Sequence, residues 1–251
     1  MPYTYEYPHP AVTVDCVVFG VDLDARDPVL KVLLVRRAEE PYAGLLAIPG
    51  GFVNIDEDLA AAALRELREE TGVGGDLATS PGSTGGSGYV EQLGTFGRPD
   101  RDPRERVITV AYFALVRTRD CAVKAGSDAA AAGWYDARKL VASRTQLAFD
   151  HRVILKAALA RLEAKARYAP VWASILPAKF TVKELGHFYD VVQGVKIADR
   201  RNSWRSLLAS QILKPAGTRV VPGDKRRTSQ LYRFDAASYE RAARGGFHFE
   251  V

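Results

Sequence analysis

The sequence predicts an α/β protein in two parts, a larger domain built on a mixed sheet and a smaller domain of helix, turn, helix and hairpin. Three observations lead to this prediction. Val- and Leu-rich segments bounded by turn residues recur through the first part, as in strands. Only two long segments of that part favour helices. The charge also changes along the 251 residues, because residues 1–170 carry 21 Lys/Arg and 23 Asp/Glu, whereas residues 171–233 carry 12 and 4.

The first part contains several candidate strands and two candidate helices. The helices are Glu57–Thr71, rich in Ala, Leu, Glu and Arg and followed by the stop residue Gly72, and Asp150–Arg167, which has one apolar face. Gly74–Gly88 is a Gly/Ser/Thr loop. The candidate strands are Val12–Val21, Val29–Arg36, Leu46–Gly51, Tyr89–Phe96, Arg106–Arg117 and a last short strand, Trp134–Asp136. This order predicts a mixed, partly antiparallel sheet.

The pattern changes after Tyr168–Pro177, a segment with two prolines that we interpret as a linker. Thr181 and Glu184 form a capping box for a helix that runs to about Val192 and stops at Gly194. The remaining elements are a helix over about Asp199–Ser210 and two strands, Leu213–Val221 and Leu231–Phe234, around the basic turn PGDKRRTS. This is the outline of a winged helix-turn-helix. We therefore expect domains over residues 1–167 and 180–251, joined by a linker over 168–179.

Composition excludes several classes of protein. With 47% hydrophobic and 26% charged residues, the chain is an ordinary globular protein and neither disordered nor a coiled coil. No apolar run approaches the ~20 residues that span a bilayer, and the N-terminus lacks the pattern of a secretory signal. Cys16 and Cys121 cannot form a disulfide framework. We expect a cytoplasmic protein that does not contact membranes.

Three carboxylates on one helix carry the strongest chemical signal. Glu66, Glu69 and Glu70 stand at i, i+3 and i+4, so they share one face of the predicted helix. Like charges at this spacing repel unless a counter-charge is present. Hard oxygen ligands suit Mg²⁺ or Mn²⁺, which in turn suit a pyrophosphate. Arg65 could orient a carboxylate or bind phosphate, and Gly50–Gly51 permits close backbone approach. Taken as a helix alone, this could also be a solvated Glu/Arg face.

The complete spacing resembles the Nudix box. Gly51 is followed after five residues by Glu57, and after seven more by the run Arg65-Glu-Leu-Arg-Glu-Glu-Thr-Gly-Val73, which matches the box at all nine specified positions. The resemblance implies a Nudix α/β/α sandwich over about residues 10–165 that hydrolyses or binds a nucleoside diphosphate linked to another group. It implies that Glu66 and Glu70 are the main metal ligands, joined by Glu69 and the Gly51 carbonyl. Glu57 and Arg65 would support them in catalysis with Mg²⁺ or Mn²⁺.

The ligand is predicted less directly. Gln92–Phe96 and the loop Arg101–Arg104, before the strand VITVAYFAL, look like the ADP-ribose branch of the family. Arginines in such a loop can bind phosphate groups bidentately, although a solvated loop is an equal alternative. Glu91 and Glu105 are candidates for a general base, and either could be a surface charge. The residues that we expect to contact the ligand are Arg36, Gly50, Phe52, Arg101 and Arg104.

The second helix of the smaller domain is basic on one side and apolar on the other. Ile197, Trp204, Leu207 and Leu208 would dock on the first helix, which leaves the cations facing outward, as in a recognition helix. Asn202 could read adenine, and the cations could hold phosphates. The expected DNA-binding residues are Lys196, Arg200, Arg201, Asn202 and Arg205 on this helix and Lys225, Arg226 and Arg227 on the wing. The alternative is a basic surface that binds no DNA.

The two halves together resemble the Nudix-related transcriptional regulators of NAD metabolism, over nearly the whole chain. The resemblance implies a repressor that senses ADP-ribose or a relative and binds a palindromic operator as a homodimer. Such regulators are similar to enzymes whose box has decayed, whereas this box is intact. An ADP-ribose pyrophosphatase with an accessory C-terminal domain is therefore an alternative. A regulator that senses a sugar such as arabinose is another.

Overall fold

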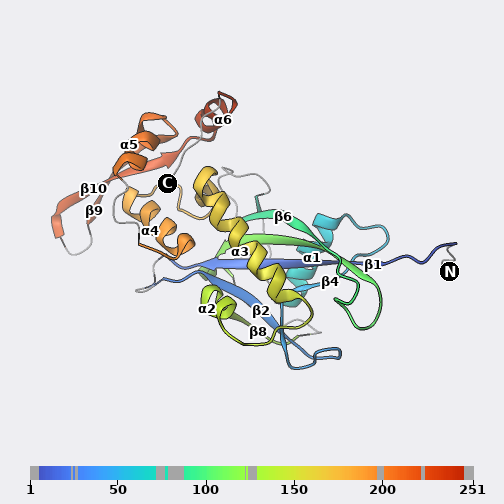
Figure 1. Ribbon diagram of the computed structural model, residues 1–251. Coiled ribbons are helices and arrows are strands. Elements are labelled where there is room, and N and C mark those ends of the chain that lie inside the picture. The colour runs from blue at the N-terminus through green and yellow to red at the C-terminus, as the bar shows by residue number, and fades with distance from the viewer. Residues whose placement is uncertain are drawn as a thin grey trace.

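The computed structural model describes residues 6–23, 25, 28–71, 77–78, 88–121, 123, 129–196, 201–221 and 224–245. In these residues an eight-stranded mixed sheet carries helices on both faces, and a smaller unit of helices and a two-stranded sheet follows it (Figure 1). This confirms the predicted fold class, a larger domain on a mixed sheet followed by a smaller unit of helix, helix and hairpin.

The strands of the large sheet are β1 Ala11–Val21, β2 Lys31–Arg37, β3 Leu46–Ala47, β4 Gly50–Phe52, β5 Leu77–Ala78, β6 Gly88–Phe96, β7 Val107–Arg117 and β8 Ala129–Asp136. Their order in the sheet is β3-β2-β1-β7-β6-β5, with β4 paired to β1 and β8 paired to β2. The centre is the parallel pair β1/β7, which is in register from Ala11 opposite Val107 to Val21 opposite Arg117. The last strand is longer than the predicted Trp134–Asp136, because pairing with β2 extends it through a run of alanines.

Strand β1 shows why both faces of the sheet are covered. Successive side chains of a strand point to opposite faces, and from Cys16 to Phe19 both sets are apolar. Val17 and Phe19 pack in the core beneath α3, His151–Tyr168, whereas Cys16 and Val18 pack beneath α1, Leu59–Thr71. Both long helices therefore lie where the sequence predicts them. A further helix that was not predicted, α2 Ala137–Ala142, follows β8 and is capped by the Asp136 side chain.

The smaller unit begins with the predicted capping box. In α4, Val182–Gln193, the Thr181 hydroxyl accepts a hydrogen bond from the Glu184 N–H, and Gly194 ends the helix with a left-handed φ of 70°. Helix α5, Arg201–Ala209, then precedes the hairpin of β9, Leu213–Val221, and β10, Asp224–Phe234. The second strand is longer than predicted, since residues of the basic turn belong to it. A final helix, α6 Ala236–Arg244, was not predicted, although Asp235 caps it.

The expected linker is part of the core. Residues Val171–Ser174 form a short 3₁₀ helix, and the Trp172 side chain is fully buried. Its ring packs edge-on against Phe180 and Phe234 of the smaller unit. The same apolar core contains Val17 of the large sheet. The two domains therefore share one continuous core. Within the described segments, no helix is long and apolar enough to cross a membrane.

Candidate functional site

A cavity of about 190 Å³ opens beside the glycine pair of the predicted box. Strand β1 contributes Thr13 and Asp15, β2 contributes Arg37, and α1 contributes Glu70. The remaining polar, glycine and aromatic residues that line it are Glu39, Gly50, Gly51, Phe52, Arg101, Asp102, Arg104, Phe149 and His151. Of the five expected ligand residues, the structure brings Gly50, Phe52, Arg101 and Arg104 to this cavity.

Arg65 connects the acidic residues of the box. Its Nε lies 2.7 Å from Glu57 Oε1, and its Nη1 lies 2.7 Å from Glu66 Oε1 and 3.1 Å from Glu69 Oε2. Its Nη2 also donates to the carbonyl of Phe52. These hydrogen bonds lower the pKa of Glu57 and raise the pKa of Arg65. Arg65 is the counter-charge that the acidic helix face requires, so this face is not merely solvated.

The glycine pair Gly50–Gly51 allows the carboxylates of Glu66 and Glu70 to approach the backbone. A Cβ at Gly51 would lie 2.4 Å from Glu66 Oε1, and a Cβ at Gly50 would lie 2.2 Å from the Val14 carbonyl oxygen. The Gly50 N–H donates to Glu70 Oε2 at 2.9 Å. Burial raises the pKa of Glu66, despite its bond to Arg65. Glu66 and Glu70 therefore flank the Gly50–Gly51 backbone, with Glu70 facing the cavity.

The donor chemistry at this point fits a hard divalent cation. Carboxylate and backbone carbonyl oxygens suit Mg²⁺, which usually takes one or two protein carboxylates and completes its shell with water and phosphate oxygens. Glu69, the third expected ligand, points to Arg65 and is 59% exposed. Among the described residues, no three Asp, Glu, His or Cys side chains converge as a complete metal cluster. The arrangement thus suits a cation shared between Glu66, Glu70 and a phosphorylated ligand.

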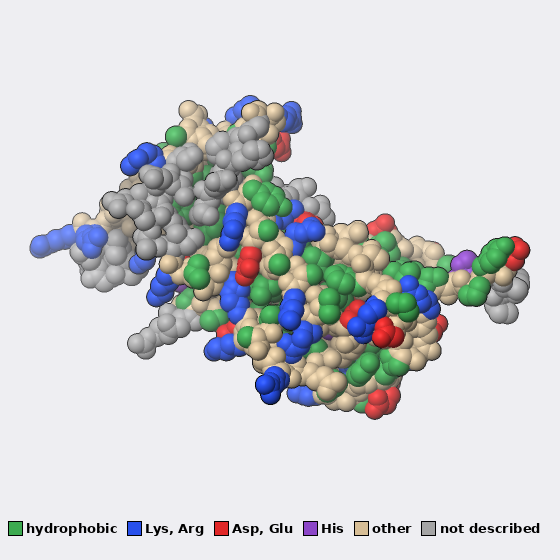
Figure 2. Space-filling view, viewed as in Figure 1, with side chains coloured by type: hydrophobic (Ala, Val, Ile, Leu, Met, Phe, Trp, Pro, Cys, Tyr) green, Lys and Arg blue, Asp and Glu red, His purple; other side chains and the backbone are tan. Residues whose placement is uncertain are grey.

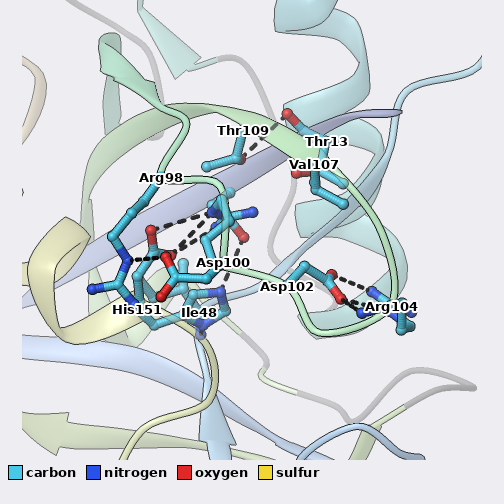
Figure 3. A network of polar contacts seen from close by, with 12 residues as sticks. Thr13, Ile48, Arg98, Asp100, Asp102, Arg104, Val107, Thr109 and His151 are labelled. Carbon is cyan, nitrogen blue, oxygen red and sulfur yellow. Dashed lines mark hydrogen bonds and ion pairs between the residues drawn. The ribbon is translucent and has the colours of Figure 1, made fainter. Parts of the chain in front are cut away.

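A buried polar network that was not predicted stabilises the wall of the cavity (Figure 3). Arg101 Nη2 lies 3.2 Å from Asp15 Oδ2 and 2.8 Å from Asp150 Oδ1, and the Arg101 side chain is only 4% exposed. His151 Nδ1 accepts from the Ile48 N–H at 2.9 Å, while its Nε2 lies 3.4 Å from Asp15 Oδ1. Burial lowers the pKa of His151. Its imidazole is therefore neutral, with the proton on Nε2.

Aromatic rings and guanidiniums lie together at the cavity lining. The Arg104 guanidinium lies 5.5 Å from the ring centroid of Phe52 and 5.9 Å from that of Phe149, and Arg37 lies 5.0 Å from Phe149. Arg104 also bonds to Asp102 through Nε and Nη2 (Figure 3). Phe149 has φ 49°, a strained value for a bulky residue. Rings and cations of this kind suit a ligand that combines a planar base with phosphates.

Strand alternation places Arg37, and not the expected Arg36, on the cavity. Arg36 is exposed, and its Nη1 donates to the carbonyl of Gly44 on the outer side. In the described part of the chain, the only hydrogen bond of the Arg37 side chain runs from Nε to the carbonyl of Pro41. A one-residue shift in strand register exchanges the faces, which is why the sequence alone selected the wrong arginine of the pair.

Neither candidate for the general base lines the cavity. Glu91 bonds to Tyr89 and, away from the cavity, to Arg161 and Lys165 of α3, and its pKa is lowered despite partial burial, because these groups donate to the carboxylate. Glu105 is exposed in the loop before β7. Sequence had no signal for Asp15 or His151, which lie 136 positions apart and meet only through the fold.

The candidate nucleic-acid interface lies on the smaller unit. Trp204 packs on Tyr189 with ring centroids 6.0 Å apart, and Leu207 is buried, so α5 docks on α4 as expected. Leu208, also expected to dock, is 37% exposed. Among the expected DNA-binding residues, Lys196, Arg205, Arg226 and Arg227 are exposed. Lys and Arg side chains reach the outer end of this unit, where Figure 1 places the hairpin (Figure 2).

Four of the expected DNA-binding residues cannot be placed in this way. Arg200 and the apolar Ile197 lie outside the described residues. Arg201 and Asn202 begin α5 and Lys225 belongs to β10, but their side chains are outside the described part. Gly72 and Val73, which complete the box, are also outside it.

Comparisons with known proteins agree with both halves of the chain. The family model described as NUDIX domain matches residues 9–158, and the model described as AraR C-terminal winged HTH domain matches residues 168–247. The chain is 33% identical to the ADPR responsive transcriptional repressor NtrR of Acinetobacter baylyi over 237 residues, which cover 94% of this chain and 86% of that protein. It is 36% identical over 150 residues to an ADP-ribose pyrophosphatase of Methanocaldococcus jannaschii, covering 60% of this chain and 73% of that enzyme.

A solved structure extends the similarity to the arrangement of both domains. The crystal structure of Shewanella oneidensis NrtR complexed with a 27mer DNA matches with a TM-score of 0.67 and 31% identity. The match covers 95% of this chain and 97% of that one.

Proposed function

The chain belongs to the Nudix family, and from this premise we propose that it is a transcriptional repressor of NAD-related metabolism. Its Nudix domain senses ADP-ribose or a related nucleotide, and its winged helix binds DNA. One observation carries the proposal: the cavity beside the box and the basic helix-and-hairpin unit share one chain and one core. The similarity to an ADPR-responsive repressor over 94% of the chain supports the same combination.

The cavity supports a nucleoside diphosphate as the ligand. Phe52 and Phe149 offer aromatic surface for an adenine, and the Nη groups of Arg37 are suited to a phosphate. Arg101 is neutralised by two aspartates, and Arg104 by Asp102. We therefore assign the direct phosphate contact to Arg37 and a positioning role to Arg101.

The charge of the cavity supports a divalent cation. Among the residues that the structure describes, its lining contains the carboxylates of Asp15, Glu39, Glu70 and Asp102 against three guanidiniums, those of Arg37, Arg101 and Arg104. The neutral His151 adds no positive charge. A pyrophosphate would therefore meet net negative charge unless a cation joined it. We propose Mg²⁺ or Mn²⁺ at Glu66, Glu70 and the Gly51 carbonyl. Such an ion would neutralise the phosphates and lower the pKa of a bound water.

The winged helix supports recognition of a palindromic operator by a homodimer. A single recognition helix contacts a few base pairs in the major groove, and two copies related by a two-fold axis read two half-sites. Arg205 on α5 and Arg226 and Arg227 on the hairpin are exposed in positions suited to phosphates. For a protein in this role we expect a cytoplasmic location.

Two measurements test the repressor proposal together. Titration calorimetry with ADP-ribose, with and without Mg²⁺, measures effector binding, and L-arabinose serves as the comparison ligand for a sugar sensor. Gel shifts with DNA from upstream of NAD-synthesis genes measure operator binding. We expect Mg²⁺-assisted binding of ADP-ribose and a change in DNA affinity when it is added. Binding of arabinose instead, or no effect of ADP-ribose on the DNA complex, would contradict the proposal.

The geometry of the box also favours a second function, hydrolysis of ADP-ribose. Arg65, Glu66 and Glu70 are arranged around the glycine pair, and the similarity to an ADP-ribose pyrophosphatase covers the same domain. Incubation with Mg²⁺ and ADP-ribose would then release AMP and ribose 5-phosphate, and Glu70→Gln would abolish the release. The absence of products from the wild type would leave this domain a sensor only.

A further inference from the structure

The end of α4 is bound by side chains of the Nudix domain. The guanidinium of Arg138, from α2, donates through Nη2 to the Val192 carbonyl, and its Nη1 lies 2.8 Å from Glu163 Oε1 of α3. Gln193 Nε2 donates to the backbone carbonyl of Glu163 at 2.9 Å. Two elements of the first domain, α2 and α3, therefore meet at the last turn of the first helix of the winged unit.

Gly194 shows how close this contact is. A Cβ on Gly194 would lie 2.0 Å from Arg138 Nε, and the residue also has a left-handed φ of 70°. The positive guanidinium thus sits at the C-terminal end of α4, where carbonyl groups lack helical partners and a cation is favoured. Helix α5 begins only seven positions later, at Arg201. A displacement of Arg138 would move the end of α4, the helix on which α5 packs through Trp204 and Tyr189.

Two elements lead from the cavity to the Arg138–Glu163 ion pair, strand β2 through its pairing with β8 and helix α3. Arg37 lines the cavity at one end of β2, and the other end of that strand, Lys31, pairs with Asp136 directly before α2. Helix α3 begins at His151, which bonds to Ile48 in the cavity wall. It reaches Glu163 about 18 Å farther on, at 1.5 Å per residue. Strands and helices are rigid elements. Helix α2, which follows the strand paired with β2, contacts α3 at the Arg138–Glu163 ion pair.

We propose that the Arg138–Glu163 pair is the joint through which the occupied cavity changes the placement of α5. This inference rests on the proposed function, because it concerns how ADP-ribose in the cavity affects DNA binding. Arg138 acts here as a positioning residue and touches neither ligand. Removal of the joint should leave both binding reactions intact and abolish the coupling between them.

Arg138→Gln tests the joint, with Lys139→Gln as the matched control. Lys139 is the next residue of α2, and its side chain is 86% exposed, with Nζ 3.6 Å from Asp136 Oδ2. The DNA is a duplex that the wild type selects from fragmented genomic DNA. In the wild type, we expect ADP-ribose to change the Kd for this duplex by about 5- to 150-fold, the usual range for allosteric coupling. In Arg138→Gln the change should fall below about twofold, whereas Lys139→Gln should match the wild type.

Two further readouts separate coupling from folding and from ligand identity. The Kd of Arg138→Gln for ADP-ribose alone and for DNA alone should stay within about threefold of the wild type. Glu163→Gln removes the ion pair but keeps Arg138 and its bond to the Val192 carbonyl, and it should reduce the coupling as well. An unchanged coupling factor in both variants would overturn the joint.

A failure of the proposed effector is distinguishable from a failure of the joint. If the wild type does not bind ADP-ribose, the proposed function fails. The joint can still be tested through the effect of DNA on the cavity wall, because coupling between two sites is reciprocal. Hydrogen exchange then measures whether DNA changes protection of the Ile48 amide, which bonds to His151. The joint predicts a change in the wild type and in Lys139→Gln but none in Arg138→Gln. An equal change in all three proteins, or none in the wild type, would overturn it.

Discussion

The Ile48 N–H donates to His151 Nδ1 across 103 positions of sequence, at 2.9 Å. This bond attaches the start of α3 to the segment that leads into the glycine pair of the box. Because Nδ1 accepts, the imidazole must be neutral in the folded protein, with Asp15 facing its other nitrogen. Burial lowers the pKa of His151 most strongly, and Arg101 and Arg37 lower it further. Asp15 and Asp150 raise this pKa, but by less than the other groups lower it.

The neutral His151 predicts a loss of stability in mild acid. Its folded pKa is depressed below the ordinary 6.5, so the unfolded chain binds the proton first as the pH falls. The contribution of His151 is complete above about pH 6.5 and decreases below it, by at most about 1.4 kcal/mol per pH unit. Urea unfolding at pH 7.5, 6.5 and 5.5 measures this slope. His151→Asn, whose side-chain oxygen can accept from Ile48, should flatten it in this window. An unchanged slope in that variant would assign the effect to other groups.

Gly51→Ala should displace Glu66 and disrupt the cation site. The new methyl group would lie 2.4 Å from Glu66 Oε1, so the carboxylate at the end of this side chain must move away from the backbone. We expect Mg²⁺ to lose its effect on ADP-ribose binding, as measured by calorimetry. Gly94→Ala is the control in the same sheet, since a Cβ there meets nothing within 4 Å. Equal behaviour of the two variants would show that the close approach to Glu66 is unimportant.

Arg65→Lys should loosen the link between α1 and the loop before it. A lysine has one ammonium group and cannot bond at once to Glu57, Glu66 and the Phe52 carbonyl, as the guanidinium does. Loss of these charge-assisted bonds should lower the free energy of unfolding. It should also raise the pKa of Glu57, which carbon-detected NMR can follow. Arg68→Lys, on an exposed position of the same helix, should change neither quantity.

Trp172→Ala tests whether the two domains unfold together. The ring is fully buried against Phe180 and Phe234 in the core that both domains share. Its removal should cost about 3–5 kcal/mol, the usual range for a large aromatic in a core. Scanning calorimetry should show a lower midpoint for the whole protein. Val153→Ala, on the exposed face of α3 at 55% exposure, should have little effect. A melting curve in which only the winged unit shifts would contradict the shared core.

The sequence predicted most of the strands, the two long helices, α4, α5 and the box because each has a local signal, whereas α2, α6 and the short β5 were not predicted. The spacing from Gly51 to Glu70 fixes which carboxylates approach the glycine pair, and the Thr181–Glu184 capping box marks the start of α4. The polar wall of the cavity has no such signal, since Asp15 sits in a Val-rich strand and His151 opens an ordinary helix. Trp172 was assigned to a linker because the neighbouring prolines suggest an irregular chain, whereas tertiary packing decides whether that chain is buried.

DNA binding should weaken steeply with salt and depend on the exposed cations of the winged unit. Removing one cation that binds a phosphate reduces the slope of log K against log salt concentration by about 1. Arg227→Gln and Arg205→Gln should each lower the slope by about that amount per subunit, in gel shifts at salt concentrations from about 50 to about 200 mM. Arg144→Gln removes the same charge from an exposed position of the first domain and should leave the slope unchanged. Because a general electrostatic effect would lower affinity equally in all three variants, a difference between the domains places the interface on α5 and the wing. Equal slopes in the three would place it elsewhere.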